Sequence, residues 1–348
     1  MARLSVSPHL RTFVSMFNAI STVRHIIRPM LRRDAPQYAS TISLFACIAI
    51  AIISLVIGLS QRSLIVQTNG YITLIDIGNS LLFLAAVQRS MRDPDMSFNY
   101  GYGKYESLAI LVSANLLIVL TIITLTEAVI IFQSPPENRN TFLLLAWSAI
   151  SFFVMRVTGR LLEKYANRFH MPMLRYDAEL WRVDSWMEIG VFASLILSGF
   201  LQFTGRFAYA AIFDGVVSIG LLLAAIQVPL KHGKEAFRQL LDRTLPDEMQ
   251  YEILAVIAEN HDRLCEFKSV HTRQSGKDIF IEIDLVMPFD YTLEHLYFLE
   301  ADILKGLHGK FPTAIPRVYV TPCDHQCEHA GETTCPVKRS LQPPTSLS

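Results

Sequence analysis

Three carboxylates lie inside stretches of the sequence that are otherwise apolar enough to cross a membrane. Asp184 and Glu188 are four residues apart in segment 178–203, and Asp76 lies in segment 66–88. A charged side chain at mid-bilayer costs about 2.5–3.5 kcal/mol on insertion scales, so such residues usually face a partner, a cavity or an ion pathway. These acids are therefore the first candidates for a functional site.

Each acid belongs to a polar stripe along one face of its segment. Asp76, Asn79 and Ser80 share a face by helical spacing. Asp177, Asp184 and Glu188 advance by seven and then four residues, so they also stay on one face. Lipid offers no hydrogen-bond partner, so such stripes are expected to face other helices or water. The two segments are predicted to face each other through them.

The composition indicates a membrane protein with a soluble part. Hydrophobic residues make up 51% of the 348 residues and charged residues 18%, and the mean hydropathy is +0.33. Six segments are near the ~20 residues that are needed to cross hydrocarbon. They are 40–61, 66–88, 107–132, 141–162, 178–203 and 207–229. The net charge of zero gives no case for a nucleic-acid partner.

The basic residues predict the orientation and the domain limits. Three connections carry a single arginine each, whereas the opposite side is rich in Lys and Arg, which places both termini in the cytoplasm. We expect four regions: a cytosolic N-terminal segment, a six-span transport domain, a cytosolic dimerisation domain and a Cys/His-rich, partly disordered tail. Their limits are 1–39, 40–230, 231–322 and 323–348.

The part of the chain that follows the last span is predicted to be a small α+β domain. Helical apolar periodicity covers Glu248–Glu259 and Leu293–Leu307. Residues Phe267–Arg273 and Asp278–Met287 alternate as strands do, and Arg317–Thr321 is a final short strand. The predicted order is helix, strand, strand, helix, strand.

Cysteine and histidine alternate beyond that last strand. The pattern Cys-x-His-x-Cys-x-His comprises Cys323, His325, Cys327 and His329, and Cys335 follows it. In a cytosolic tail, this pattern indicates a metal site rather than disulfides, and thiolates would select zinc, copper(I) or an iron–sulfur cluster. The alternative is a reduced tail with incidental thiols, since the spacing matches no zinc-finger pattern. Cys265 would join such a site only if the fold brings it close.

Six further motifs follow one another along the chain, and their order and spacing matter more than any one of them. They are Leu74–Ser80, Tyr100–Ser107, Glu127, Asp214-Gly215, Leu240–Pro246 and Thr272–Gly276. Together they resemble the cation diffusion facilitator family of divalent-metal/proton antiporters, from about Ser43 to Cys323. The resemblance implies an α-helical membrane protein, in which a six-transmembrane-helix bundle precedes a cytosolic α+β ferredoxin-like domain, and it implies a homodimer.

The same resemblance implies a four-ligand transport site, with (His or Asp)-x-x-x-Asp in span two and again in span five. Asp76 and Asp184 occupy the second position of each pair. The first positions hold Ile72 and Leu180, whose apolar side chains cannot bind a metal. Half of the usual ligand set is therefore missing.

Two oxygen donors lie one turn beyond the remaining acids, on the same stripes. We predict that Asn79 and Glu188 replace the missing ligands, which gives the set Asp76, Asn79, Asp184 and Glu188. An all-oxygen set suits Mn²⁺, Fe²⁺ or Mg²⁺ better than Zn²⁺. The alternative for Glu188 is a helix-packing hydrogen bond or an ion pair with Arg182 or Arg156.

Other polar residues have family counterparts with weaker implications. Glu127 and Asp214 match family positions near span ends, and together with Asp177 they are predicted to have gating or structural roles. The family's accessory metal site, in the loop after span two, uses His residues. Here Phe98 and Tyr102 stand at those positions beside Asp95, so that site is predicted to be absent.

Three functions from different classes remain to be compared. The first is a secondary transporter that exports a divalent metal from the cytoplasm in exchange for protons. The alternative is a transport-defective, metal-responsive membrane sensor or scaffold. An enzyme is disfavoured because the sequence has no nucleophile–base pair, phosphate loop or nucleotide fingerprint. Transport requires no cofactor, and its partners are the metal, protons, the lipid bilayer of the cell (inner) membrane and a second copy of the chain.

Overall fold

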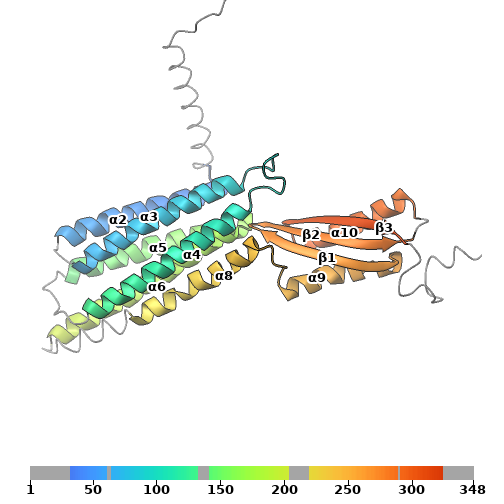
Figure 1. Cartoon of the computed structure of the whole chain (residues 1–348). Helices are drawn as coiled ribbons and strands as arrows, with labels where there is room; N and C mark the ends of the chain where they lie inside the picture. Colours follow the sequence, from blue (N-terminus) through green and yellow to red (C-terminus); the bar gives the residue numbers. More distant parts are fainter. Residues whose placement is uncertain (1–31, 61–63, 132–140, 204–218, 289–290, 324–348) are drawn as a thin grey trace, which may run out of the picture. The chain divides into compact units, whose positions relative to one another are not determined.

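The computed structural model describes residues 32–60, 64–131, 141–203, 219–288 and 291–323 (Figure 1). The chain divides into two compact units between Glu235 and Ala236. The first unit is helical, and the second contains a small sheet.

Five long helices make up most of the first unit (Figure 1). They are α2 (Pro36–Ser60), α3 (Leu64–Ser90), α4 (Lys104–Ile131), α5 (Thr141–Phe169) and α6 (Pro172–Phe203), and α8 (Gln227–Leu240) leads out of the unit. Helix α2 packs against α3 and α5, α5 packs against α6, and α4 contacts α3 and α6. These helices correspond to the first five predicted spans, whereas residues 207–218 of the sixth lie outside the described residues.

Length and composition separate these helices into two kinds. Within α2, α4 and α5, the stretches Pro36–Ile57, Lys104–Thr126 and Phe142–Phe169 are long and apolar enough to cross a membrane. Helices α3 and α6 have 27 and 32 residues, which is also sufficient length, but they carry the polar stripes. The two polar helices are therefore the ones expected to be enclosed by the others or to line a path.

The break between α5 and α6 has a local cause. His170 has φ 52°, a left-handed conformation that ends α5, and Pro172 is the first residue of α6. Proline is favoured at the first helical position because an N–H there has no partner within the helix, so its loss costs nothing. Pro36 begins α2 in the same way.

The second unit has the predicted order of elements. It consists of α9 (Asp247–Ala258), β1 (Glu266–Ser275), β2 (Asp278–Met287), α10 (Leu293–Lys310) and β3 (Ala314–Pro322). The strands lie in the order β1-β2-β3, with β1 antiparallel and β3 parallel to the central β2 (Figure 1). The helix-strand-strand-helix-strand prediction is thus confirmed, and only the ends of the elements differ.

The alternation along β2 builds the core of this unit. Every second β2 side chain from Ile279 to Met287 is buried, and these residues pack with buried residues of both helices. The helical contributions are Ile253, Val256, Ile257, Leu299, Ile303 and Leu307. Both helices therefore cover the same face of the sheet, which is why one face of β2 is continuously apolar.

Two glycines of α10 provide a matched test of this packing. A Cβ added at Gly306 would lie 2.7 Å from Val256 Cγ1 of α9, whereas one at Gly309 would meet nothing within 4 Å. We expect Gly309→Ala to stabilise the unit by up to about 1 kcal/mol through helix propensity. Gly306→Ala is expected to destabilise it by about 1–3 kcal/mol through overpacking. Hydrogen exchange of the α9 and α10 amides in the full-length protein measures both, and equal effects would contradict the close α9–α10 approach.

Candidate metal site

The α3 stripe contains a buried amide without a partner. Asn79 is 5% exposed, and neither its Nδ2 nor its Oδ1 has a hydrogen-bond partner in the described part of the chain. A buried polar group left unpaired costs about 1–3 kcal/mol. Asp76, one turn earlier, is half-buried, and Ser80 Oγ lies 3.3 Å from Cys47 Sγ of α2. The α3 face thus presents oxygen donors that the protein itself does not fully use.

Asp177, the first acid of the α6 stripe, interacts with a neighbouring helix. Asp177 is 4% exposed, and Ser43 of α2 hydrogen-bonds to it. Trp181 Nε1 in turn donates to Ser43 Oγ at 2.9 Å. Asp177 Oδ2 has no partner among the residues that the structure covers. This network supports a structural role for Asp177 in joining α2 to α6, and its free oxygen is compatible with the predicted gating role.

Asp184 and Glu188 have different surroundings although they lie one turn apart. Ser148 Oγ of α5 donates to Glu188 Oε2 at 2.6 Å, so one carboxylate oxygen of Glu188 makes the helix-packing hydrogen bond that was the alternative to metal binding. Asp184 is exposed. Exposing a carboxylate of a membrane helix to hydrocarbon is very costly. The accessible side of Asp184 is therefore expected to face water, an ion or protein.

The structure places the predicted acids within electrostatic range of one another, but among the described residues they are not grouped as a metal cluster. Asp184 interacts electrostatically with Asp76, Glu188 and Asp177. Helices α3 and α6 also meet where the rings of Phe83 and Tyr176 lie 5.8 Å apart. Across the described ranges, however, no three His, Cys, Asp or Glu side chains are grouped as a bound metal requires. Ile72 and Glu127 have side chains that are not described, and Asp214 lies outside the described residues.

Sequence reasoning missed the contribution of α2 to this region. Ser40, Ser43 and Cys47 are buried in α2, and two of them contact the stripes of the neighbouring helices. Their spacing of three and four residues places them on one helical face, so the signal was present. It was weak because serine and cysteine are small enough to be accommodated in any apolar helix.

A charged cluster that the sequence did not predict joins three helices near their ends. His232 Nε2 of α8 lies 2.9 Å from Glu179 Oε2 of α6. Arg182 lies 3.8 Å from Glu179 and 3.9 Å from Glu163 of α5. Arg182 is therefore engaged with these two acids, and among the described ion pairs none joins it to Glu188.

The loop between α3 and α4 is held by Asp95. Its carboxylate accepts hydrogen bonds from Tyr102 Oη at 2.6 Å and from the amides of Ser97 and Phe98 at 2.8 and 2.9 Å. These bonds, led by that from Tyr102, hold the pKa of Asp95 below its usual range. The rings of Phe98 and Tyr102 lie 4.5 Å apart. Asp95 therefore organises this loop.

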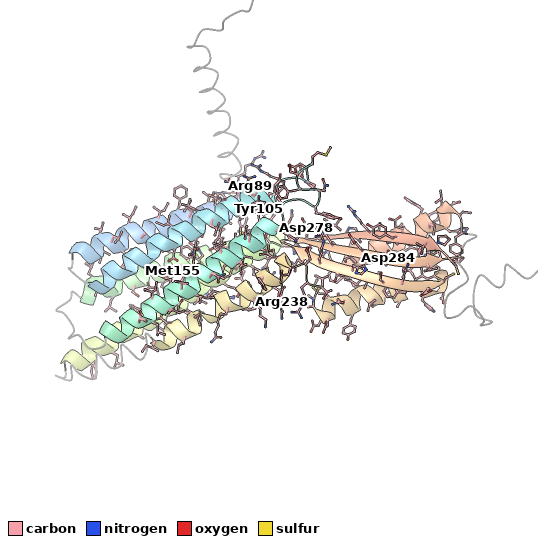
Figure 2. All side chains as sticks on the ribbon, in the orientation of Figure 1. Arg89, Tyr105, Met155, Arg238, Asp278 and Asp284 are labelled. Carbon is pink, nitrogen blue, oxygen red and sulfur yellow. The ribbon has the colours of Figure 1, made fainter. Side chains whose placement is uncertain are left out.

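Arg89 of α3 and Tyr105 of α4 are neighbours at the two ends of this loop (Figure 2). The Arg89 guanidinium carbon is 5.8 Å from the centre of the Tyr105 ring. Tyr105 also contacts the Phe98 and Tyr102 rings, at 6.2 and 5.9 Å. The loop is thus anchored to both α3 and α4 by aromatic packing.

The two units match two domains of one family. Residues 40–241 match the cation efflux transmembrane domain, and residues 245–319 match the cytoplasmic domain of cation efflux proteins. The chain belongs to the cation efflux family. Membership confirms the predicted cation diffusion facilitator resemblance and the architecture of a helical membrane domain followed by a cytoplasmic domain. It makes the chain a metal cation efflux transporter by family and a membrane protein.

Relatives in the cation efflux family align along most of the chain. The cation-efflux pump FieF of Serratia proteamaculans is 26% identical over 259 residues, which cover 72% of this chain and 81% of the relative. FieF of Escherichia coli O127:H6 is 25% identical over 251 residues, with the same shares. A solved structure of CzrB in its zinc form is 29% identical and covers 23% of this chain and 90% of that one, with a TM-score of 0.22.

Removal of one hydroxyl tests the Asp95 loop of this cation efflux protein. Tyr102→Phe keeps the ring packing but removes the hydrogen bond that contributes most to the lowered pKa of Asp95. We expect the pKa of Asp95 to rise towards its usual value and the amides of Ser97 and Phe98 to exchange faster. Because the pKa is lowered in the folded loop, the hydrogen bonds persist at neutral pH and are lost only on acidification through that pKa. Tyr105→Phe is the control, and equal loop exchange in both variants would contradict the role of Tyr102.

Proposed function

We propose that this protein exports a divalent metal ion from the cytoplasm across the cell (inner) membrane in exchange for protons. The proposed ligands are Asp76, Asn79, Asp184 and Glu188. The observation that supports this site best is the Asn79 amide, which is buried without a partner one turn from Asp76. Both termini are proposed to be cytoplasmic, and the cytoplasmic domains to join two copies.

Like charges around Asp184 explain why a cation would bind there. Asp184 interacts electrostatically with Asp76 and Glu188, and both interactions disfavour three ionised carboxylates. A divalent cation relieves this repulsion, and so do protons. Since carboxylates must lose their protons to bind a metal, the two compete for the same oxygens, which is the basis of an exchange mechanism.

The ligand types limit the choice of metal. The proposed set contains carboxylate and amide oxygens only, which suit Mn²⁺, Fe²⁺ or Mg²⁺ better than Zn²⁺. Glu188 can contribute one oxygen while the other keeps the Ser148 hydrogen bond. The described arrangement is open, so metal binding is proposed to draw α3 and α6 together.

A metal-responsive sensor that does not transport is the second candidate. It is favoured by Ile72 and Leu180, whose apolar side chains stand at the usual ligand positions. The two candidates differ in one measurement. Metal-dependent proton flux in vesicles that contain the purified protein supports transport, and metal binding without flux supports the sensor.

Removing the charge of Asp76 or Asp184, the two acids at the usual family ligand positions, tests the site directly. We expect Asp76→Asn and Asp184→Asn each to lower Mn²⁺ flux into vesicles by at least about 100-fold, since even residues that only support metal ligands contribute 10–100-fold. Both variants should insert normally because neither changes the apolar faces of the helices. Asp93→Asn, in the exposed α3–α4 loop, is the control. Undiminished flux in either site variant would remove that residue from the site.

Two asparagines in membrane helices provide a matched test of Asn79. Asn115 of α4 is exposed, and its Nδ2 donates to Leu111 O of its own helix at 2.7 Å. Asn79→Leu is expected to weaken metal affinity at least about 10-fold. It should also stabilise the solubilised protein by about 1–3 kcal/mol, because an unpaired buried amide is removed. Asn115→Leu should leave the flux unchanged. Metal titration of flux and thermal unfolding measure the two effects, and a loss of stability in Asn79→Leu would show that the amide has a partner.

A further inference from the structure

Helix α5 has an exposed apolar face on the side opposite its packing contacts. It packs against α2 and α6 through a buried face that includes Ser148 and Leu162. By helical spacing, the opposite face carries large apolar residues that are 55–82% exposed: Phe142, Ile150, Phe153 and Val157. In a membrane helix, apolar side chains with this exposure are in the environment of the acyl chains, which are as apolar as they are.

The exposed face becomes basic towards the end of the helix. Arg160 and Lys164 continue the row of Phe153 and Val157 at helical spacing, and both are exposed. Arg160 lies 18 positions after Phe142. At the rise of an α-helix these positions span about 27 Å, close to the ~30 Å thickness of the hydrocarbon core. The change from apolar to basic therefore falls at the depth where phospholipid headgroups begin.

The basic residues of this face have no counter-charge within the described part of the chain. Arg156, Arg160 and Lys164 are four residues apart, a spacing at which like charges repel each other on a helix. The described ion pairs and hydrogen bonds include none made by these three side chains. Glu163, the only acid between Thr141 and Phe169, lies 3.9 Å from Arg182 of α6. The row of cations is thus suited to an anion from outside the protein.

Two more cations lie at the same end of α5. Arg168 is 3.5 Å from Asp34, but both side chains are largely exposed, so this pair holds the guanidinium only weakly. Arg175 of α6 donates to Asn167 Oδ1 of α5 at 3.5 Å, which places its charge beside the end of the basic row. The basic end of the face is therefore a surface formed by two helices.

We propose that the exposed face of α5 binds an anionic phospholipid. Arg160 and Lys164 hold the phosphate, and the acyl chains lie along Phe153 and Val157. Guanidinium groups bind phosphate through two parallel hydrogen bonds, and lysine contributes a point charge. The long side chain of Arg156 extends from within the apolar region towards the same headgroup. A free phosphate ion would use only the basic end, whereas a lipid matches both parts of the face.

The proposed surface is independent of the metal sites predicted from the sequence. It shares no residue with the proposed transport ligands, and it depends on residence in a membrane, which the family shows, rather than on transport. The predicted tail ligands lie outside the described residues: His325, Cys327, His329 and Cys335.

Lipid titration of the full-length protein tests this surface. The protein is purified in a neutral detergent and titrated with phosphatidylglycerol or with phosphatidylcholine of the same acyl chains, and native mass spectrometry counts the bound lipids. We expect the double variant Arg160→Ala/Lys164→Ala to weaken phosphatidylglycerol binding about 25-fold, since each basic residue near a membrane surface contributes about 5-fold. Binding of phosphatidylcholine should not change. Lys305→Ala/Lys310→Ala, which removes two exposed charges from α10, is the matched control and should bind both lipids as the unmodified protein does.

Further measurements separate the lipid from other occupants. Phe153→Ser should weaken the binding of both lipids, because it acts on the acyl chains. Inorganic phosphate at the concentration of the lipid should not displace phosphatidylglycerol, and displacement would overturn the proposal in favour of a small-anion site. Equal phosphatidylglycerol affinity in the α5 double variant and the α10 control would also overturn it. So would a change of oligomeric state in the α5 double variant, which would show that a second copy covers the face. The readout is lipid binding, so its failure is distinguishable from a failure of the transport proposal.

Discussion

The cost of a carboxylate in hydrocarbon governs the arrangement of the membrane unit. Each acid of the α6 stripe meets that cost in a different way. Asp177 is hydrogen-bonded by Ser43 in a network that Trp181 extends, and Glu188 accepts a hydrogen bond from Ser148 of α5. Asp184 has an accessible surface and its main interactions are with other acids. The acids on one stripe therefore divide into two that bind neighbouring helices and one whose charge requires a cation, a proton or water.

Buried polar atoms without hydrogen-bond partners also indicate a site, because leaving them unpaired is costly. A folded protein pairs nearly all of its buried polar groups, so an orphan amide such as that of Asn79 indicates either an absent ligand or stored strain. Its place beside Asp76 favours a ligand, because the spacing that puts both on one helical face also directs them to the same space. The neighbouring Ser80 has a partner in Cys47, which shows that α2 can pair a polar residue of α3 where no ligand is needed.

The proposed transport ligands are carboxylate and amide oxygens of membrane helices. Hard oxygen donors prefer hard cations, so the ligand type limits which metals the site can hold. Asp95 illustrates another outcome for a carboxylate: with Tyr102 in hydrogen-bond reach, it stabilises a loop.

The sequence by itself determined the order of elements in both units, because helical and strand periodicities are local properties. The alternation from Ile279 to Leu285 predicted β2 and its buried face, and the stripes of α3 and α6 predicted which helices carry the acids. Tertiary structure decided the partners. Ser148 is forty residues from Glu188, and Ser43 is still farther from Trp181, so no local period links either pair. Only packing selects which distant side chains meet, since each helix or strand can present the same face to many neighbours.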